Sequence, residues 1–268
     1  DERYKIAMDT LRKQMAEQPR TSEGGFWHKL RYPHQMWLDG IFMASPYLVQ
    51  YGATFDEPAL FDEATKQILL IKSKTYYHGW DESHEQKWSN PETGCSPNFW
   101  SRSIGWYGAA IVDVLDFLPQ ETAGRDSIIQ ILQGLAKAIV KYQDPSSGTW
   151  YQVTDQGARE GNYLESSATA LFIYTLAKAI NKGYIGNEYI EPTQKAFDGM
   201  VKTFTRLEED GSYTITNCCA VAGLGGDSKR YRDGSFEYYI SEPIIENDPK
   251  SVGSFILAAI EYEKMTKK

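Results

Sequence analysis

Apolar residues along this chain recur mostly at helical spacing. In the first segment, Ile6, Leu11 and Met15 fall on one face of a predicted helix. The same reading predicts eight helices, over residues 1–15, 35–51, 58–72, 98–118, 125–142, 162–182, 186–205 and 252–264. Helical period dominates throughout, so the pattern predicts an all-α fold.

Long loops rich in polar and aromatic residues separate some of these helices, at 18–34, 73–97 and 220–247. Short strands are predicted only beside such connections, at 149–153 and 211–216. Residues 168–180 are apolar nearly all round, whereas other helices carry one clear polar face. Buried inner helices that alternate with half-exposed outer helices predict an α/α toroid whose long loops meet at one end. A superhelical solenoid is the alternative.

Composition limits the partners more than the fold. The 268 residues fit one domain with a large core, and they carry 28 Lys and Arg against 36 Asp and Glu. A formal net charge of −8 without a basic cluster argues against nucleic acid. No stretch reaches the ~20 apolar residues of a membrane span, which argues against a membrane. The run Gly223-Leu224-Gly225-Gly226 has no βαβ unit around it and predicts a turn with positive φ rather than a nucleotide site.

Cysteine usage bears on the compartment. Cys95, Cys218 and Cys219 have neither the number nor the spacing of a disulfide framework or a zinc motif. A reducing compartment fits this usage, and no signal peptide is visible at the start of the sequence. A cytoplasmic location is therefore favoured, with an exported form as the alternative.

Candidate chemistry is concentrated in three short segments, 36–40, 77–81 and 97–106. Tryptophan faces stack on sugar rings, and arginine holds a carboxylate through two parallel hydrogen bonds. An aspartate in an aromatic, partly dry pocket can keep or give a proton near neutral pH. The segments predict a site for an acidic sugar with Asp39 as the acid/base, together with His28, Trp37, His78, Trp100, Arg102 and Trp106.

Each of these residues also has a purely structural interpretation. Asp39 can cap the start of a helix, and Arg102 can pair with a nearby acid such as Asp81. Trp100 and Trp106 are six residues apart, which places them on rather different helical faces, so at least one of them can belong to the core.

The histidines allow a third interpretation. His28 and His78 each stand beside Trp or Tyr in a polar loop, which favours contact with a ligand over an ordinary loop position. Together with His34 and Asp39 they suggest a metal site, but the i, i+4 helical spacing that metal sites favour is absent. We therefore expect no metal here.

At these residues the chain resembles the unsaturated rhamnogalacturonyl hydrolases, glycoside hydrolase family 105. The match keeps its order over almost the whole chain. Its segments are Phe26-Trp27-His28-Lys29, Met36-Trp37-Leu38-Asp39-Gly40, Tyr77-His78-Gly79-Trp80-Asp81 and residues 88–94, 96–106, 142–144, 161–167 and 232–239.

The resemblance implies an (α/α)6 barrel that removes a 4,5-unsaturated galacturonate from a rhamnose-containing pectin disaccharide. In this chemistry an acid protonates C4 of the enol-ether double bond, water adds at C5, and the glycosidic link then falls apart, without metal or cofactor. Carried over by motif, Asp39 is the general acid/base, His28 and His78 bond sugar hydroxyls or Asp39, Arg102 binds the uronate carboxylate, and Trp37, Trp100 and Trp106 wall the ring.

The chain departs from the family pattern at its beginning. An (α/α)6 barrel has twelve helices, so we expect one barrel domain over 1–268 that lacks about four N-terminal helices and the second aspartate that the family places there. Three alternatives to the galacturonyl-rhamnose activity stay open. They are an unsaturated glucuronyl hydrolase acting on glycosaminoglycan disaccharides, a non-catalytic uronate-binding remnant, and a helical scaffold without ligand.

Overall fold

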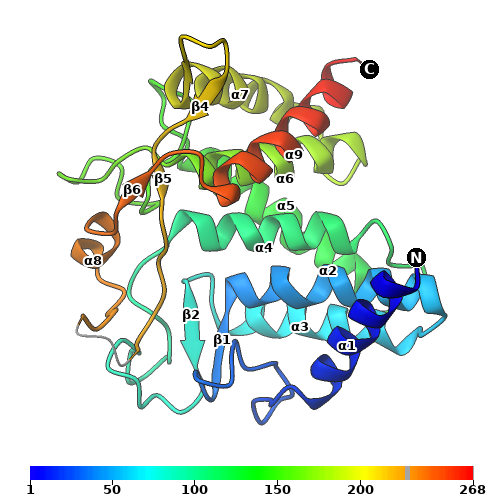
Figure 1. The fold of residues 1–268 in the computed structure, drawn as a ribbon. Helices are drawn as coiled ribbons and strands as arrows, with labels where there is room; N and C mark the ends of the chain where they lie inside the picture. The colour runs from blue at the N-terminus through cyan, green and yellow to red at the C-terminus, as the bar shows by residue number, and fades with distance from the viewer. Residues whose placement is uncertain (227–229, 268) are drawn as a thin grey trace.

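The computed structural model describes residues 1–226 and 230–267, and helices dominate it (Figure 1). Within these residues, eight helices have 14 or more residues. They are α1 (Glu2–Glu17), α2 (Leu38–Phe55), α3 (Ala59–Lys74), α4 (Ser101–Val114), α5 (Arg125–Lys141), α6 (Ser166–Asn181), α7 (Ile190–Phe204) and α9 (Pro249–Thr266). The 3-10 turn η1 (Asn187–Tyr189) and the short helix α8 (Phe236–Ile240) complete the set. The expected all-α class is confirmed. No helix in the described part is both long and apolar enough to cross a membrane.

The helices form an inner row and an outer layer. In the row, α2 packs on α4, α4 on α6 and α6 on α9, while α3 and α7 pack outside α2 and α6, and α5 packs against α3 and α4. Helix α6 is buried from Ser166 to Ala179, as an inner helix must be. Helix α5 buries only one stripe and leaves its other side in solvent. This arrangement agrees with the alternation that the hydrophobic pattern predicts.

The two ends of the inner row keep apolar side chains in solvent. Met43 of α2 is exposed, as are Ile256 and Ile260 of α9. By contrast, α6 in the middle of the row has helices packed on several sides. The difference reflects the number of neighbours that each inner helix has within the described residues.

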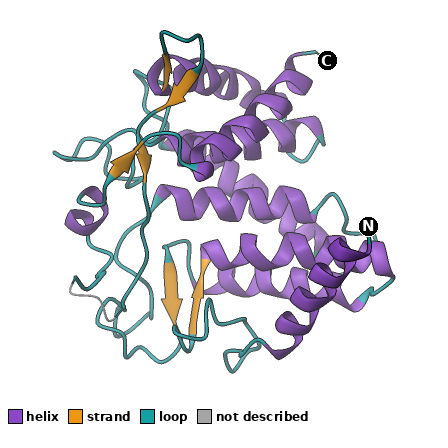
Figure 2. Cartoon of the chain, viewed as in Figure 1, coloured by secondary structure: helices purple, strands orange, loops and turns teal. Residues whose placement is uncertain are grey.

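Three two-stranded antiparallel sheets lie among the loops at one end of the helices (Figure 2). They pair β1 (Gln35–Trp37) with β2 (Gly79–Asp81), β3 (Thr205–Leu207) with β4 (Tyr213–Ile215), and β5 (Cys218–Cys219) with β6 (Ile244–Ile245). In the first sheet, Trp37 stands opposite Gly79, so the residues just before β2 lie beside the start of α2. The inner helices begin at this end of the molecule, which directs the positive ends of their dipoles toward it.

Several boundaries differ from the prediction. Residues 35–37 pair as strand β1 instead of opening helix α2. Helix α4 starts at Ser101 and α6 at Ser166, later than the periodicity predicts. The predicted strand at 149–153 makes only single bridges, to Leu164 and Trp100. The predicted loop 220–247 contains α8 and β6. In each case a partner distant in the chain decides the backbone conformation, which local periodicity cannot report.

Candidate active site

Asp39 is the second residue of α2, where the helix N-terminus stabilises a carboxylate. Its side chain is 14% exposed and lies beside His78, with Oδ2 of Asp39 3.2 Å from Nε2 of His78. The β1–β2 sheet produces this contact, because the backbone N–H of Leu38 donates to the carbonyl of His78 at 3.1 Å. The structure therefore brings together two residues that are far apart in sequence and that both belong to the predicted site.

The charge on Asp39 results from opposing effects. Burial raises the pKa of the carboxyl group, but His78 and His28 lower it, and the net shift is downward from 3.8. Neither Oδ2 of Asp39 nor Nε2 of His78 has hydrogen-bond geometry with a partner, so the contact is electrostatic rather than a linear hydrogen bond. The net effect favours the ionised form of the Asp39 carboxyl group, and its role in keeping or giving a proton near neutral pH stays a prediction.

His78 is fully enclosed, and its second ring nitrogen has a partner that residue-by-residue reasoning missed. Nδ1 lies 2.8 Å from the hydroxyl oxygen of Tyr239, from α8. The ring also packs at 4.6 Å from Trp100 and edge-on at 5.2 Å from Trp37. The only sequence signal for Tyr239 was its place in the last matching segment of the family resemblance.

His28 stacks on Trp37, with ring centroids 4.1 Å apart and an interplanar angle of 13°. Burial lowers the pKa of His28 to about 4, so the ring is neutral at pH 7. A Cβ at position 40 would stand only 3.0 Å from Nδ1 of His28, which explains why glycine follows Asp39. Tyr32 also stacks on Trp37, at 4.8 Å. Other rings therefore already cover Trp37.

Arg102 is only 1% exposed and lies behind Trp100, with its guanidinium carbon 4.7 Å from the centre of the indole. Its Nη1 donates to Ser167 Oγ at 3.2 Å and to the carbonyl of Cys219, and it lies 3.9 Å from Oε1 of Glu165. Its acid partner is thus Glu165, which also caps α6, rather than an acid of the 77–82 segment. Nε of Arg102 is buried without a hydrogen-bond partner among the described residues. This donor is therefore buried and unused, and binding of a uronate by Arg102 stays a prediction.

Trp100 directly precedes α4 and Trp106 lies within it, and the two side chains occupy different places, as their spacing predicts. Trp100 is enclosed next to His78, and its Nε1 donates to Oε1 of Gln152 at 3.1 Å. Trp106 packs against Phe42, one turn beyond Asp39 on α2, at 4.5 Å. Trp106 is therefore not part of the cluster around His78, and its role as a wall for the sugar also stays a prediction.

His34 stands outside this cluster. Its ring tilts against Trp27 at 4.7 Å and lies 3.5 Å from Glu82 at the surface. Within residues 1–226 and 230–267, no group of three or more His, Cys, Asp or Glu side chains is arranged to hold a metal ion.

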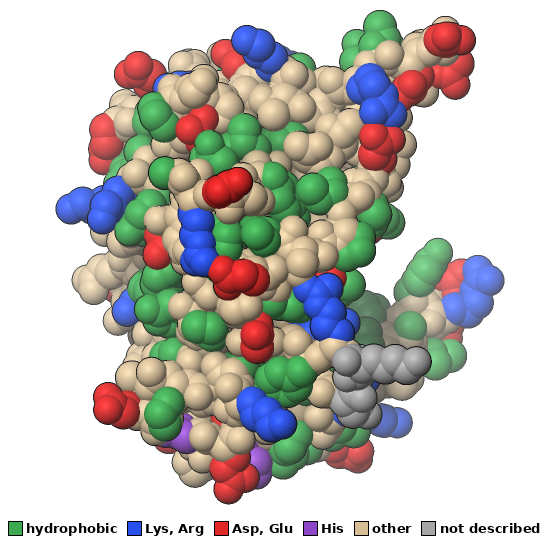
Figure 3. All heavy atoms as spheres, turned by 90° about the vertical axis from the view of Figure 1, so that its left-hand side faces the viewer, with side chains coloured by type: hydrophobic (Ala, Val, Ile, Leu, Met, Phe, Trp, Pro, Cys, Tyr) green, Lys and Arg blue, Asp and Glu red, His purple; other side chains and the backbone are tan. Residues whose placement is uncertain are grey.

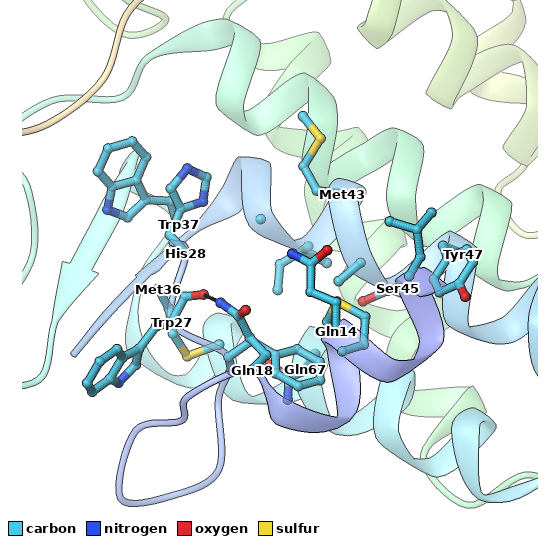
Figure 4. A pocket seen from close by; sticks show the side chains of 16 residues that line it. Gln14, Gln18, Trp27, His28, Met36, Trp37, Met43, Ser45, Tyr47 and Gln67 are labelled. Carbon is cyan, nitrogen blue, oxygen red and sulfur yellow. Dashed lines mark hydrogen bonds between the residues drawn. The ribbon is translucent and has the colours of Figure 1, made fainter. Parts of the chain in front are cut away.

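A pocket of ≈ 270 Å³ adjoins the cluster between α1 and α2. Figure 4 shows the rings of His28 and Trp37 side by side at one end of it, with the Gln14 side chain of α1 near its middle. Asp39 does not line this pocket, although Gly40 does. We therefore centre the candidate active site on the Asp39–His78 contact, with the pocket as a neighbouring space.

A second arginine near the cluster was not predicted. Arg232 lies in the Gly-rich loop that leads to α8, and it makes no ion pair among the described residues. One of its Nη atoms and Cζ3 of Trp37 are 2.8 and 3.6 Å from the point where a Cβ on Gly223 would stand. Its guanidinium is thus close to the Trp37 indole. Figure 3 shows that acidic, basic and apolar side chains are intermixed on this end of the molecule.

Comparison with known proteins agrees with the resemblance. The family model described as Glycosyl Hydrolase Family 88 matches residues 1–266. A family 105 glycoside hydrolase of C. acetobutylicum is 43% identical with a TM-score of 0.95, covering 98% of this chain and 74% of that chain. Protein Atu3128 of Agrobacterium fabrum is 35% identical over 229 residues, covering 82% of this chain and 97% of that protein. An unsaturated 3S-rhamnoglycuronyl hydrolase of Formosa agariphila is 26% identical over 171 residues, which cover 59% of this chain and 44% of that protein.

Proposed function

We propose that this chain, a glycoside hydrolase that belongs to glycosyl hydrolase family 88, removes a 4,5-unsaturated galacturonate from a small rhamnose-containing oligosaccharide. The observation that carries the proposal is the Asp39 carboxyl group. It is largely enclosed, stands at the positive end of a helix and touches the His78 imidazole at 3.2 Å. A single carboxyl group in such surroundings can first donate a proton and then accept one.

The proposed reaction uses Asp39 twice. Protonated Asp39 delivers its proton to C4, the electrons of the C4=C5 bond form the new C4–H bond, and positive charge develops at C5 and the ring oxygen. Water attacks C5, and the Asp39 carboxylate takes the proton that the water loses. The hemiketal at C5 then opens, and the exposed C1 hemiacetal releases the second sugar. The proton on Asp39 is restored, so the cycle needs no other acid.

This cycle requires Asp39 to gain a proton when substrate binds. The free carboxylate is ionised at neutral pH, as its lowered pKa indicates. The uronate brings a second negative charge into the same enclosed space and displaces water, and both effects raise the pKa of a neighbouring carboxyl group. Substrate binding and protonation of Asp39 are therefore coupled.

The surroundings of Asp39 suit an acidic sugar. Because the inner helices begin at this end, their dipoles favour an anion there. We assign His28 to the wall of the sugar site, with Trp37 stacked against it and Trp100 enclosed beside His78. The free Nε–H of Arg102 and the unpaired guanidinium of Arg232 are the donors for the uronate carboxylate. Arg232 is the more accessible of the two, because Arg102 is enclosed behind Trp100.

Rhamnose as the second sugar is supported by similarity. The 43% identity to a family 105 enzyme extends over nearly the whole chain, and the Formosa relative is named for a rhamnoglycuronyl substrate. Unsaturated glucuronyl hydrolysis of glycosaminoglycan disaccharides is the competing assignment. Turnover of both disaccharides, followed by loss of the ultraviolet absorbance of the C4=C5 bond, decides between them.

The experiment that tests the proposal compares Asp39→Asn with the unaltered protein on unsaturated galacturonyl-rhamnose. We expect kcat to fall by roughly 10²–10⁴-fold, because the amide neither donates nor accepts the reacting proton. Asp62→Asn is the matched control, since Asp62 also stands in the first turn of a helix but on outer helix α3. Near-full activity in Asp39→Asn overturns the assignment of the acid. Binding without turnover by the unaltered protein, seen by calorimetry, favours a non-catalytic uronate-binding protein.

A further inference from the structure

Tyr239 has no role in the reaction described above, yet it contacts the residue that faces Asp39. Its hydroxyl oxygen lies 2.8 Å from Nδ1 of His78, and both side chains are fully enclosed. The Tyr239 ring is parallel to Trp100, with centroids 6.0 Å apart, and its carbonyl accepts from Nε2 of Gln152 at 3.2 Å. These contacts hold the hydroxyl group at one position beside the imidazole.

Hydrogen-bond satisfaction decides which atom donates in this pair. Burial keeps the Tyr239 hydroxyl protonated, because it raises the pKa of that group well above 10. If the hydroxyl donates to Nδ1, both groups are satisfied. If Nδ1–H donates instead, the hydroxyl hydrogen needs a different acceptor, and within the described residues its one hydrogen-bond partner is His78. A buried donor left without an acceptor costs about 1–3 kcal/mol, so the hydroxyl is the donor.

A neutral imidazole has one N–H, and an Nδ1 that accepts a hydrogen bond places this N–H on Nε2. Nε2 is the atom that faces Oδ2 of Asp39 at 3.2 Å. We infer that Tyr239 is a positioning residue that fixes the orientation and tautomer of His78, so that the ring nitrogen 3.2 Å from the Asp39 carboxylate carries the proton rather than a lone pair. The inference deepens the proposed function, because it gives Tyr239 control over the protonation state of the proposed acid.

The opposite tautomer would place a lone pair against the carboxylate and would favour protonated Asp39 before substrate arrives. Other groups also act on Asp39: His28 from the loop before β1, Arg102 of α4 and the N-terminus of α2. None of them contacts the Tyr239 hydroxyl, so Tyr239→Phe removes one influence and leaves the rest in place. Phenylalanine also keeps the ring that lies parallel to Trp100.

Nitrogen-15 NMR of the histidine rings tests the inference without substrate, so its outcome does not depend on the proposed reaction. In the unaltered protein we expect the His78 proton on Nε2 and the chemical shift of a hydrogen-bonded acceptor at Nδ1. In Tyr239→Phe the Nδ1 signal should move to that of an unbonded nitrogen. Tyr238→Phe is the matched control, because the neighbouring hydroxyl accepts from the Gly223 N–H instead.

The pH dependence of kcat/KM provides the second measurement. A general acid is active when protonated, so kcat/KM falls as pH rises through the pKa of Asp39 in the free enzyme. In Tyr239→Phe the His78 ring is no longer held against Asp39, so the Asp39 carboxylate is less stabilised. The falling limb of the kcat/KM pH profile should therefore move to higher pH. We also expect kcat to fall about tenfold while KM stays within twofold, because the acid loses its fixed neighbour whereas the contacts to substrate are kept.

Two results overturn the inference. One is a His78 proton on Nδ1 in the unaltered protein, which decides the question even if Tyr239→Phe does not fold. The other is a folded Tyr239→Phe whose Nδ1 signal and pH limb match those of Tyr238→Phe. A correct tautomer together with no turnover of any unsaturated disaccharide leaves the role of Tyr239 toward His78 intact and rejects the proposed reaction.

Discussion

Charged side chains have close partners at one end of the inner helices, whereas buried polar atoms lack hydrogen-bond partners at the other end. At the far end, which we define as Asp113, Asp116, Tyr174 and Lys178, the Lys178 ammonium lies 2.6 Å from Asp113, 2.7 Å from Asp116 and 3.0 Å from the Tyr174 hydroxyl. At the site end, Oδ2 of Asp39, Nε2 of His78 and Nε of Arg102 are buried without hydrogen-bond partners in the described residues. One end has a complete network, and the other retains unused donors and acceptors.

The difference separates stability from function. In a fully hydrogen-bonded network, the interactions offset the free-energy cost of burying the charges. A buried group without a partner instead costs about 1–3 kcal/mol. Such a cost persists where the unpaired donor or acceptor binds a ligand or a reacting atom. Unsatisfied buried groups gather at functional sites for this reason. The far end therefore holds helices α4 and α6 together, and the site end is left ready for substrate.

The largest expected effect comes from neutralising the one strong acid partner at the site end. Glu165→Gln leaves the enclosed Arg102 guanidinium without its negative partner and weakens the cap of α6. Breaking a buried pair on one side costs about 3–5 kcal/mol, so we expect a fall of that size in the free energy of unfolding, measured in urea. Glu246→Gln is the control, since Glu246 forms an exposed pair with Arg206 whose loss should leave the free energy of unfolding nearly unchanged.

Lys178→Met is the corresponding change at the far end. Asp113 and Asp116 keep part of their hydration, with side chains 21% and 24% exposed, so the loss should be smaller, about 1–3 kcal/mol. We expect kcat and KM to stay unchanged, because the far end is at the opposite ends of α4 and α6 from the site. A large fall in kcat in a folded Lys178→Met would contradict the proposal that the far end serves stability and the site end serves catalysis.

The two ends should also respond to opposite extremes of pH. His28 titrates near 6.5 when unfolded and near 4 when folded, so the unfolded chain takes up a proton first as pH falls. Stability present above pH 6.5 is then lost between pH 6.5 and about 4, by up to about 3 kcal/mol. The Lys178 network acts in the other direction. Burial lowers the pKa of Lys178, but its acid partners outweigh burial and raise it, so the contribution of the network is lost as pH rises above 10.5.

Thermal unfolding at pH 7 and pH 4.5 tests the contribution of His28. His28→Gln should show a smaller loss of stability between these pH values than the unaltered protein. His84→Gln, a change at an exposed histidine, should show the same loss as the unaltered protein. Equal acid sensitivity in all three proteins would mean that His28 is not a neutral, enclosed ring in the folded state.

The smallest expected effect concerns substrate affinity. Arg232→Gln removes the accessible guanidinium near Trp37, and we expect KM for the unsaturated disaccharide to rise about tenfold with kcat within twofold, equivalent to about 1.4 kcal/mol of binding. Arg232→Lys should recover only part of the loss, because an ammonium cannot form the two-pronged contact. Arg159→Gln, which removes an exposed arginine paired with Glu237, should leave KM unchanged.

Much of the fold was predictable because it depends on local pattern. The helical period located all eight long helices, since burying one face at 3.6-residue spacing is decided within each segment. It failed at residues 35–37, where pairing with β2 overrides helical propensity, and at α8, which is too short to show a period. The structural alternative for Arg102 named the right type of contact and the wrong acid, because Glu165 is 63 residues away.

The site was predicted in part for the same reason. Asp39, His28 and Trp37 are close in sequence, so their motif already placed them together. The orientation of His78 between Asp39 and Tyr239, and the enclosure of Arg102 behind Trp100, depend on contacts between residues as far as 161 positions apart. No local pattern encodes such contacts.

The amino-acid sequence alone therefore determined the fold class, the helices, the family resemblance and the acid proposed for the reaction. Each of these depends on residue types at short or ordered spacing. Only the tertiary structure decided the charge of Asp39, the partner of Arg102 and the hydrogen bond that holds His78. Those properties depend on distance and burial, and both are set by how separate segments pack.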